Sequence, residues 1–211
     1  MRTYRTASLN VLWFLIALNV VIWVFTLVRP ESMITFLGLT PVLVPRQPWT
    51  ILTAMFVQYD FWHILFNMVS LYFLGSFFLR AAGERNFLAV FFIGGLAGNL
   101  LYFLLGYLVY QGLIPSALGD PFSPAIGASG AVFAIGAALA VLVPRVRVFI
   151  IPIPVPMPLW IAILIFFVIL IIVPILAPSL GIAWQGHLGG AVAGAIMGYL
   201  LRRRGQSYYP R

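Results

Sequence analysis

The sequence predicts an all-α membrane protein: a bundle of six transmembrane helices with both termini in the cytoplasm. Three observations support this prediction, namely an apolar composition, six apolar stretches and the distribution of the basic residues. Of the 211 residues, 63% are hydrophobic and only 8% are charged. Because a soluble domain has about 25% charged residues, this chain has too little polar surface to fold as a water-soluble protein. We therefore expect the lipid bilayer to surround it.

Six apolar stretches follow one another along the chain, separated by polar segments and by segments rich in proline or glycine. A helix needs about 20 apolar residues to cross a bilayer core about 30 Å thick. The first stretch follows Arg2 and Arg5 and is too long for the apolar region of a signal peptide, so we expect it to be retained. The predicted spans are residues 9–28, 62–79, 87–109, 127–143, 158–176 and 186–201. With no repeat or linker between them, residues 1–211 are predicted to form a single domain.

The basic residues, all of which are arginines, predict the orientation. If the N-terminus is cytoplasmic, ten of the twelve arginines fall on cytoplasmic segments, and only Arg29 and Arg46 fall outside. This bias is the positive-inside pattern of membrane proteins, and it favours an even number of spans. The net charge of +8 could also suggest a nucleic-acid partner. The arginines are scattered over short loops and the chain ends, so we expect no nucleic-acid binding.

Two long connecting segments are predicted outside the cytoplasm. Residues 29–61 are apolar but are interrupted by four prolines, so we expect this segment to lie in or on the outer interface. Residues 110–126 are rich in glycine, proline and serine. On the cytoplasmic side, four prolines alternate with other residues and predict an extended stretch, because proline lacks the N–H that a regular helix needs. These are Pro152, Pro154, Pro156 and Pro158.

Polar side chains inside an apolar span are costly, so each of them calls for an explanation. The predicted spans contain no aspartate, glutamate or lysine, but they contain both histidines of the chain. Counting about 1.5 Å per helical residue from the cytoplasmic arginines places four of these side chains roughly 20 to 26 Å from that side. The four are His63, Asn67, Ser129 and His187. Three different helices therefore bring a serine, two histidines and an asparagine to a similar depth.

Glycines next to Ser129 and His187 indicate how these two residues could meet. Ser129 lies within Gly127-Ala128-Ser129-Gly130, at the start of the fourth span. His187 is followed by glycines at four-residue spacing, a pattern that allows close helix contact in membranes. We expect a glycine-faced sixth helix to pack on a glycine-faced fourth helix and to place the imidazole beside the hydroxyl, as a serine hydrolase requires. The three glycines are Gly190, Gly194 and Gly198.

His63 and Asn67 lie one turn apart on one face of the second span. Both side chains can donate a hydrogen bond to a negatively charged oxygen that develops during hydrolysis. The chain has no cysteine, which excludes a cysteine nucleophile and cysteine-based metal sites. Two histidines without acidic or cysteine ligands do not complete a metal site, so we expect no metal and no cofactor.

Three motifs resemble the signature motifs of rhomboid intramembrane proteases, in the same order and on spans two, four and six. They are His63-Ile-Leu-Phe-Asn67-Met68, Gly127-Ala128-Ser129-Gly130 and Gly186-His187-Leu188-Gly189-Gly190. The resemblance covers residues 9–204, and it is the combination of the three motifs that makes it specific. It implies a rhomboid-like six-helix bundle. A buried site needs water, so we expect the active site to open to the extracytoplasmic side, and the all-arginine basic set and the compact size suggest a prokaryotic plasma membrane.

The resemblance also implies residue roles. Ser129 would be the nucleophile and His187 the general base, while His63, Asn67 and the Ser129 backbone N–H would form the oxyanion hole. Phe133 matches a position at which the family often has an aromatic ring packed on the catalytic histidine. Helix packing at the site would involve Gly127, Gly130, Gly190 and Gly194.

The implied substrates are membrane proteins with a single span, cleaved by a serine endopeptidase within or near the outer leaflet. Two other functions remain open. One is a catalytically silent rhomboid-like protein that binds membrane helices, although such relatives typically lack the serine or the histidine that this chain has. The other is a small channel or transporter, for which we would expect charged residues in the spans or inverted repeats. The sequence does not indicate an oligomeric state.

Overall fold

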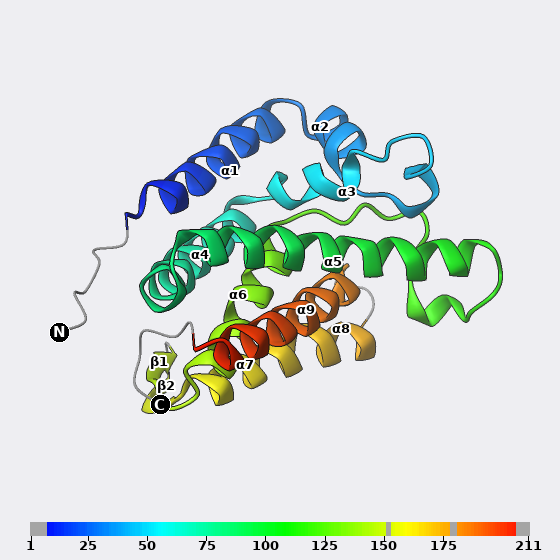
Figure 1. The fold of residues 1–211 in the computed structure, drawn as a ribbon. Helices are drawn as coiled ribbons and strands as arrows, with labels where there is room; N and C mark the ends of the chain where they lie inside the picture. Colours follow the sequence, from blue (N-terminus) through cyan, green and yellow to red (C-terminus); the bar gives the residue numbers. More distant parts are fainter. Residues whose placement is uncertain (1–7, 151–152, 178–180, 206–211) are drawn as a thin grey trace.

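The computed structural model describes residues 8–150, 153–177 and 181–205, and it is mostly helical. Figure 1 shows long helices side by side, with shorter segments along one edge. Each predicted span corresponds to a helix, and the ends differ by only a few residues. These helices are α1 (Asn10–Val28), α4 (Phe61–Ala82), α5 (Glu84–Tyr110), α6 (Ser129–Leu142), the continuous helix Leu159–Leu176 and α9 (Trp184–Arg203).

The helix Leu159–Leu176 consists of three parts that follow one another without a break. They are α7 (Leu159–Phe167), a π-helical stretch η4 (Val168–Ile172) and α8 (Val173–Leu176). A π-helical stretch widens the turn and changes which backbone groups are paired, and such stretches are frequent at functional sites.

Four helices are long and apolar enough to cross a membrane, as judged by length and composition: α1, α4, α5 and Leu159–Leu176. The other two predicted spans lie outside this group for different reasons. α6 has only 14 residues, which corresponds to about 21 Å of helix. α9 has 20 residues, but its glycines, glutamine and terminal arginines make it less apolar than these four helices.

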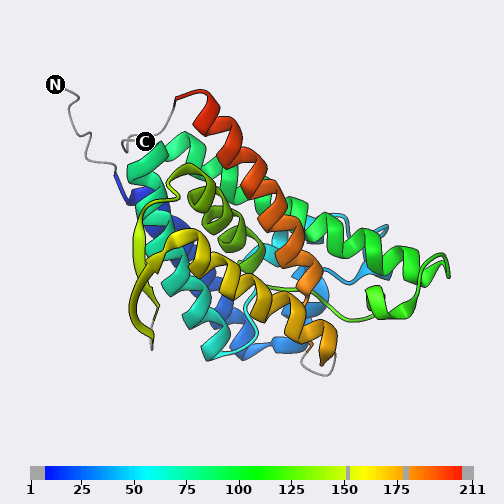
Figure 2. The ribbon, with the colours of Figure 1, turned by 90° about the horizontal axis from the view of Figure 1, so that it is seen from below.

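α6 is the central helix of the structure. Figure 2 shows it between α4, α7 and α9, and its main packing partners are α9, α5, α4 and α7. Every side chain from Ala131 to Leu139 is buried, and this stretch belongs largely to the main hydrophobic core. A helix covered on all sides by protein does not need the length of a helix exposed to lipid, which explains how so short a helix is accommodated.

α9 packs on α6 through a stripe of small residues that are in register. An added Cβ on any of three α9 glycines would overlap a backbone carbonyl oxygen of α6, so the two backbones lie in direct contact. Such small-residue stripes let membrane helices approach closely and form Cα–H···O contacts. The pairs are Gly190 with Gly130, Gly194 with Ala134, and Gly198 with Ala138. The expected glycine face of α6 is therefore only partly correct, since two of its three positions are alanines.

α5 packs against both α6 and α9. An added Cβ on Gly94 would overlap the Ala134 side chain of α6, and one on Gly98 would overlap the Gly186 carbonyl oxygen of α9. The three helices therefore pack around small residues on each of their shared faces. This arrangement fixes the height of α9 relative to α6, and with it the positions of the side chains at the N-terminal ends of both helices.

The segment between α1 and α4 is largely helical but broken into short pieces by its prolines. Its elements are α2 (Pro30–Leu37), η1 (Pro41–Leu43), α3 (Thr50–Thr53) and η2 (Ala54–Phe56). The Trp49 indole N–H donates to the Phe36 carbonyl oxygen (2.8 Å), and the Thr53 hydroxyl donates to the Leu37 carbonyl oxygen (2.8 Å). An isolated antiparallel bridge pairs Leu39 with Ala125, in the segment that contains η3 (Ser116–Leu118) and leads to α6.

The proline-rich stretch before α7 is extended, as predicted, but it is also paired, which was not predicted. β2 (Ile153–Pro158) forms an antiparallel hairpin with β1 (Arg147–Ile150), so the chain is mostly helical rather than all-α. Alternating prolines are compatible with an edge strand because the missing N–H groups all fall on the unpaired side. Pro152 lies outside the described residues.

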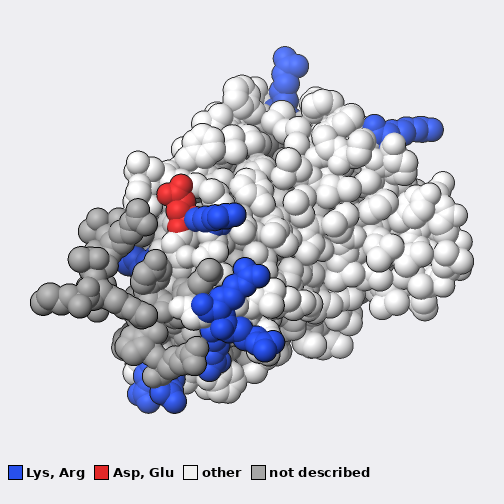
Figure 3. All heavy atoms as spheres, viewed as in Figure 1, with Lys and Arg blue, Asp and Glu red and all other residues white. Residues whose placement is uncertain are grey.

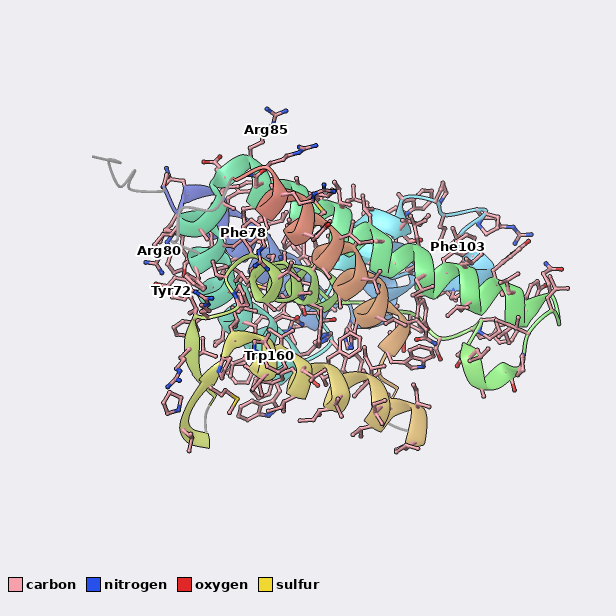
Figure 4. All side chains as sticks on the ribbon, turned by 60° about the horizontal axis from the view of Figure 1, so that its bottom comes forward. Tyr72, Phe78, Arg80, Arg85, Phe103 and Trp160 are labelled. Carbon is pink, nitrogen blue, oxygen red and sulfur yellow. The ribbon has the colours of Figure 1, made fainter. Side chains whose placement is uncertain are left out.

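The basic side chains gather at one end of the molecule. In the face shown in Figure 3, most of the basic side chains lie near the C-terminal end of α9, and two lie at the opposite edge. Arg80 and Arg85 lie on either side of the turn between α4 and α5 at the former end, as labelled in Figure 4. Arg202 and Arg203 form the last turn of α9. Arg2, Arg5 and Arg211 lie outside the described residues.

The contact between α6 and α9 predicts a position-dependent response to a single added methyl group. Gly194→Ala should destabilise the protein by about 1–3 kcal/mol, because the methyl group would overlap the Ala134 carbonyl oxygen. Gly186→Ala on the same helix is the matched control, since nothing lies within 4 Å of the added Cβ. The free energy of unfolding in detergent micelles measures both effects. Equal stability of the two variants would contradict the contact.

Candidate active site

Ser129 and His187 meet at the N-terminal ends of α6 and α9. The Ser129 Oγ and the His187 Nε2 are 2.8 Å apart. On the other side of the ring, Nδ1 lies 3.1 Å from the Leu170 carbonyl oxygen. Because a carbonyl oxygen can only accept, the ring proton lies on Nδ1 and Nε2 accepts the hydrogen bond from the Ser129 hydroxyl. This is the arrangement of a nucleophile and its general base.

The Leu170 carbonyl occupies the place that a carboxylate has in a Ser-His-Asp triad. Leu170 lies in the π-helical stretch η4. The residue four positions further on is Pro174, which has no N–H and cannot form the usual helical hydrogen bond with this carbonyl. The backbone of the fifth long helix thus orients the imidazole without a charged side chain.

Phe133 stacks on the His187 ring. The two ring centroids are 4.8 Å apart and the ring planes differ by 25°. Phe133 lies one turn after Ser129 on α6, so one helix carries both the hydroxyl and the ring that holds the imidazole in place. His187 retains only 7% of its surface exposed. The packing of this ring restricts the imidazole to the orientation that faces Ser129.

Gly127 lies between Ser129 and the two polar side chains of α4. Its φ is +120°, a region that favours glycine. An added Cβ would lie 2.7 Å from the His63 Nε2 and 3.7 Å from the Asn67 Nδ2. The Gly127 N–H donates to the Ala54 carbonyl oxygen (2.9 Å), which holds this backbone in place. His63 and Asn67 therefore border the backbone that leads into Ser129.

The donor groups of His63 and Asn67 have defined orientations. The Tyr59 backbone N–H donates to the His63 Nδ1 (3.2 Å), so in a neutral ring the proton lies on Nε2, the nitrogen next to Gly127. The Asn67 Nδ2 donates to the Gln58 Oε1 (3.0 Å) and to the His63 carbonyl oxygen (3.1 Å). The Ser129 N–H begins α6, where backbone N–H groups have no partner within the helix. The Ser129 N–H and the His63 Nε2–H can stabilise a negative charge on an oxygen that forms beside Ser129. Both hydrogens of the Asn67 NH2 group are already bonded, so this group donates to that oxygen only in place of its bond to the His63 carbonyl.

Asp120 shapes the segment that precedes the site. Its carboxylate accepts hydrogen bonds from the backbone N–H groups of Phe122 and Ser123 and from the Ser123 hydroxyl. The hydroxyl bond is the main cause that lowers the pKa of Asp120 below its usual value. The Tyr102 hydroxyl donates to the Ser123 carbonyl oxygen (2.9 Å) and ties the segment to α5. The chain therefore enters α6 along a fixed path.

Three contacts of the site have no counterpart in the sequence-based prediction. They involve the Leu170 carbonyl, the Gln58 side chain, and Gln185, which donates to the Leu118 carbonyl oxygen (3.0 Å) and ties the start of α9 to η3. A backbone carbonyl leaves no trace in residue type, although Pro174 within an apolar span was an indirect signal. Gln58 lies just before the second predicted span, so a search for polar residues inside spans does not find it. Among the described residues, no group of three metal-binding side chains comes together.

Comparison with known proteins identifies the family. The model of the Rhomboid domain matches residues 45–204. The chain is 34% identical over 162 residues to "RHOMBOID-like protein 12, mitochondrial" of Arabidopsis thaliana, which covers 73% of this chain and 46% of that protein. It is 24% identical over 159 residues to "Rhomboid protein 1, mitochondrial" of Saccharomyces cerevisiae, covering 73% of this chain and 42% of that protein.

A bacterial relative carries a protease name. The chain is 26% identical over 129 residues to "Putative rhomboid protease YdcA" of Bacillus subtilis, which covers 59% of this chain and 58% of that protein. The chain spans about half the length of these curated relatives. The family model alone matches well over half of this chain. The resemblance inferred from the three motifs is therefore confirmed, and the chain belongs to the rhomboid family of membrane proteins.

Proposed function

We propose that this protein is an intramembrane serine endopeptidase that cleaves single-span membrane proteins. The observation that carries the proposal is the 2.8 Å contact between the Ser129 Oγ and the His187 Nε2, in a bundle of which four other helices are long and apolar enough to cross a membrane. The rhomboid family, which includes intramembrane serine proteases, supports the same reaction. A half-buried serine bonded to a buried histidine in an apolar bundle has little structural reason to be there, which also favours a catalytic role.

In the proposed reaction, His187 accepts the proton of the Ser129 hydroxyl as Oγ attacks the carbonyl carbon of the scissile peptide bond. The negative charge moves to the carbonyl oxygen, where the Ser129 N–H and the His63 Nε2–H stabilise it. The Asn67 amide joins them by turning one N–H from the His63 carbonyl oxygen to the oxyanion. His187 then gives its proton to the leaving amine as the C–N bond breaks. Water, activated by the same imidazole, hydrolyses the acyl-enzyme ester and regenerates the serine.

The Leu170 carbonyl has a defined part in this proposal. It keeps the proton on the His187 Nδ1, so that Nε2 is free to accept from the serine. A neutral carbonyl stabilises the positively charged imidazolium less than a carboxylate would. The N-terminal end of α6 compensates in part, because its dipole favours negative charge on the oxyanion beside Ser129.

We further propose six spans in one domain over residues 1–211, with both termini cytoplasmic and the site open to the extracytoplasmic side. Two features support α6 and α9 as spans: the small-residue contact that joins them, and arginines at the end of α9. α6 is about 21 Å long, whereas the bilayer core is about 30 Å thick. If α6 ends at the cytoplasmic surface, Ser129 at its start lies below the outer surface. Relatives are bacterial and mitochondrial, and we favour a prokaryotic plasma membrane.

The proposed substrates follow from the depth of the site. A peptide bond inside a helix is shielded by its own hydrogen bonds, so a substrate helix has to unwind before Ser129 can reach its carbonyl carbon. Residues that weaken helices, such as glycine and proline, should therefore favour cleavage. The silent helix-binding protein, our second hypothesis from the sequence, would bind the same helices without cleaving them.

A fluorophosphonate probe tests the proposed nucleophile without knowledge of the substrate. It should label the detergent-purified protein at Ser129, because the probe reacts only with an activated hydroxyl. Labelling should be lost in Ser129→Ala and in His187→Ala, and it should persist in Ser76→Ala, a serine on α4 bonded to the Phe73 carbonyl oxygen. Mass spectrometry of the labelled peptide identifies the modified residue. Folded wild-type protein that stays unlabelled at several pH values would argue for the silent helix-binding protein.

The proposed topology can be tested with single cysteines, because the natural chain has none. Ser116→Cys should react with a membrane-impermeant maleimide in intact cells, since Ser116 is exposed on the proposed outer side. Arg204→Cys, exposed after the end of α9, should react only after the membrane is permeabilised. The reverse pattern, or equal reaction at both positions in intact cells, would contradict the six-span arrangement.

A further inference from the structure

Three buried amide side chains form a continuous hydrogen-bonded chain that ends at Asn67. Asn19 comes from the middle of α1, Gln58 from the segment just before α4, and Asn67 from α4. Their exposed fractions are 0%, 0% and 6%. The Gln58 Nε2 donates to the Asn19 Oδ1 (2.9 Å), and the Asn67 Nδ2 donates to the Gln58 Oε1 (3.0 Å). Burying three amides in an apolar core is costly unless each is paired, so this chain calls for an explanation.

The direction of the hydrogen bonds is determined at the α1 end. The Asn19 Nδ2 donates to the Leu15 carbonyl oxygen (2.9 Å), which can only accept. This leaves the Asn19 oxygen facing Gln58, so Gln58 has to present its NH2 group there. The Gln58 oxygen then faces Asn67, which in turn has to present its own NH2 group. Each amide therefore helps to set the orientation of the next. The His63 carbonyl oxygen accepts the second hydrogen of the Asn67 NH2 group (3.1 Å), so this carbonyl and the Gln58 oxygen together hold the Asn67 amide.

The orientation at the Asn67 end matters because of what lies beside it. The Asn67 Nδ2 is the atom that borders Gly127, two residues before Ser129. If the amide were rotated by 180°, its carbonyl oxygen would take this place. An oxygen with partial negative charge would then repel the negative charge that develops beside Ser129, where a donor is needed. With the NH2 group in this place, the hydrogen now bonded to the His63 carbonyl oxygen can turn to the oxyanion while Gln58 keeps the other one.

We propose that Gln58 and Asn19 are positioning residues that hold the Asn67 amide with its NH2 group toward Gly127 and Ser129. The atoms nearest to an added Cβ at Gly127 belong to His63 and Asn67, so Gln58 and Asn19 act through Asn67. This inference rests on the proposed function, because it gives Asn67 the role of an oxyanion donor. It also gives α1, which otherwise contributes no side chain to the site, a part in the chemistry.

The rate at which a fluorophosphonate modifies Ser129 reports on this role, because the phosphonyl oxygen takes the place of the oxyanion. In Gln58→Met, which has a similar volume but no hydrogen-bonding amide, the maximal rate constant of modification should fall roughly tenfold to a hundredfold. The probe concentration that gives half the maximal rate should change little. Asn19→Leu should reduce the same rate constant by a smaller factor, since Gln58 remains but loses its orientation.

A double-mutant cycle separates positioning from general damage. In an Asn67→Ala background, Gln58→Met should cause no further loss of the maximal rate constant. The control is Asn99→Leu, which removes another amide bond, a half-buried one from the Asn99 Nδ2 to the Ile51 carbonyl oxygen (2.8 Å). It should leave the rate constant unchanged. Thermal unfolding of each variant identifies any that fails to fold, in which case Asn19→Leu carries the same comparison from the other end of the chain.

Two results would overturn the inference while leaving the proposed function intact. One is modification of Gln58→Met and Asn19→Leu at the wild-type maximal rate. The other is an equal loss from Gln58→Met whether residue 67 is asparagine or alanine, which would indicate a structural role only. Absence of labelling in the wild-type protein is a different outcome, since it would remove the proposed function and this inference with it.

Discussion

The direct backbone contact between α6 and α9 is the constraint on which the rest of the site depends. Both helices present small residues at four-residue spacing, so the glycines of α9 rest against the carbonyl groups of α6. A contact of this kind has essentially one register, because a shift along the helix would drive a larger side chain into the backbone. That register brings His187, on the first turn of α9, to the Ser129 hydroxyl at the start of α6.

The site is built from neutral groups, which suits an apolar environment. No acidic side chain orients His187; the Leu170 carbonyl does so, in a stretch of helix where Pro174 removes a competing N–H. The groups beside Gly127 are likewise neutral donors, and a chain of neutral amides holds one of them. Burying an unpaired carboxylate here would cost far more than burying these dipoles. The described arginines lie in the first or last turn of a helix, in connecting segments or in β1.

The sequence predicted the parts that depend on residue type and spacing. Hydropathy located the helices of the six predicted spans but not the short helices α2 and α3, and the glycine pattern after His187 predicted which helix pair would be in contact. It did not show which α6 residues face Gly194 and Gly198, because alanine as well as glycine fits against a glycine. These residues are Ala134 and Ala138. It missed the hairpin, since pairing between β1 and β2 depends on a turn rather than on the proline pattern. It also missed Leu170 and Gln58, because the first acts through its backbone and the second lies outside any span.

The most direct test of the central claim is cleavage of a single-span reporter protein in liposomes that contain the purified protein. The reporter's span should carry a glycine or proline near its outer end, and mass spectrometry of the products locates the cut. The account predicts that the wild-type protein hydrolyses a peptide bond within or next to the span and that Ser129→Ala does not. Cleavage at the same bond and rate by Ser129→Ala, or no cleavage by folded wild-type protein across a panel of such reporters, would contradict it.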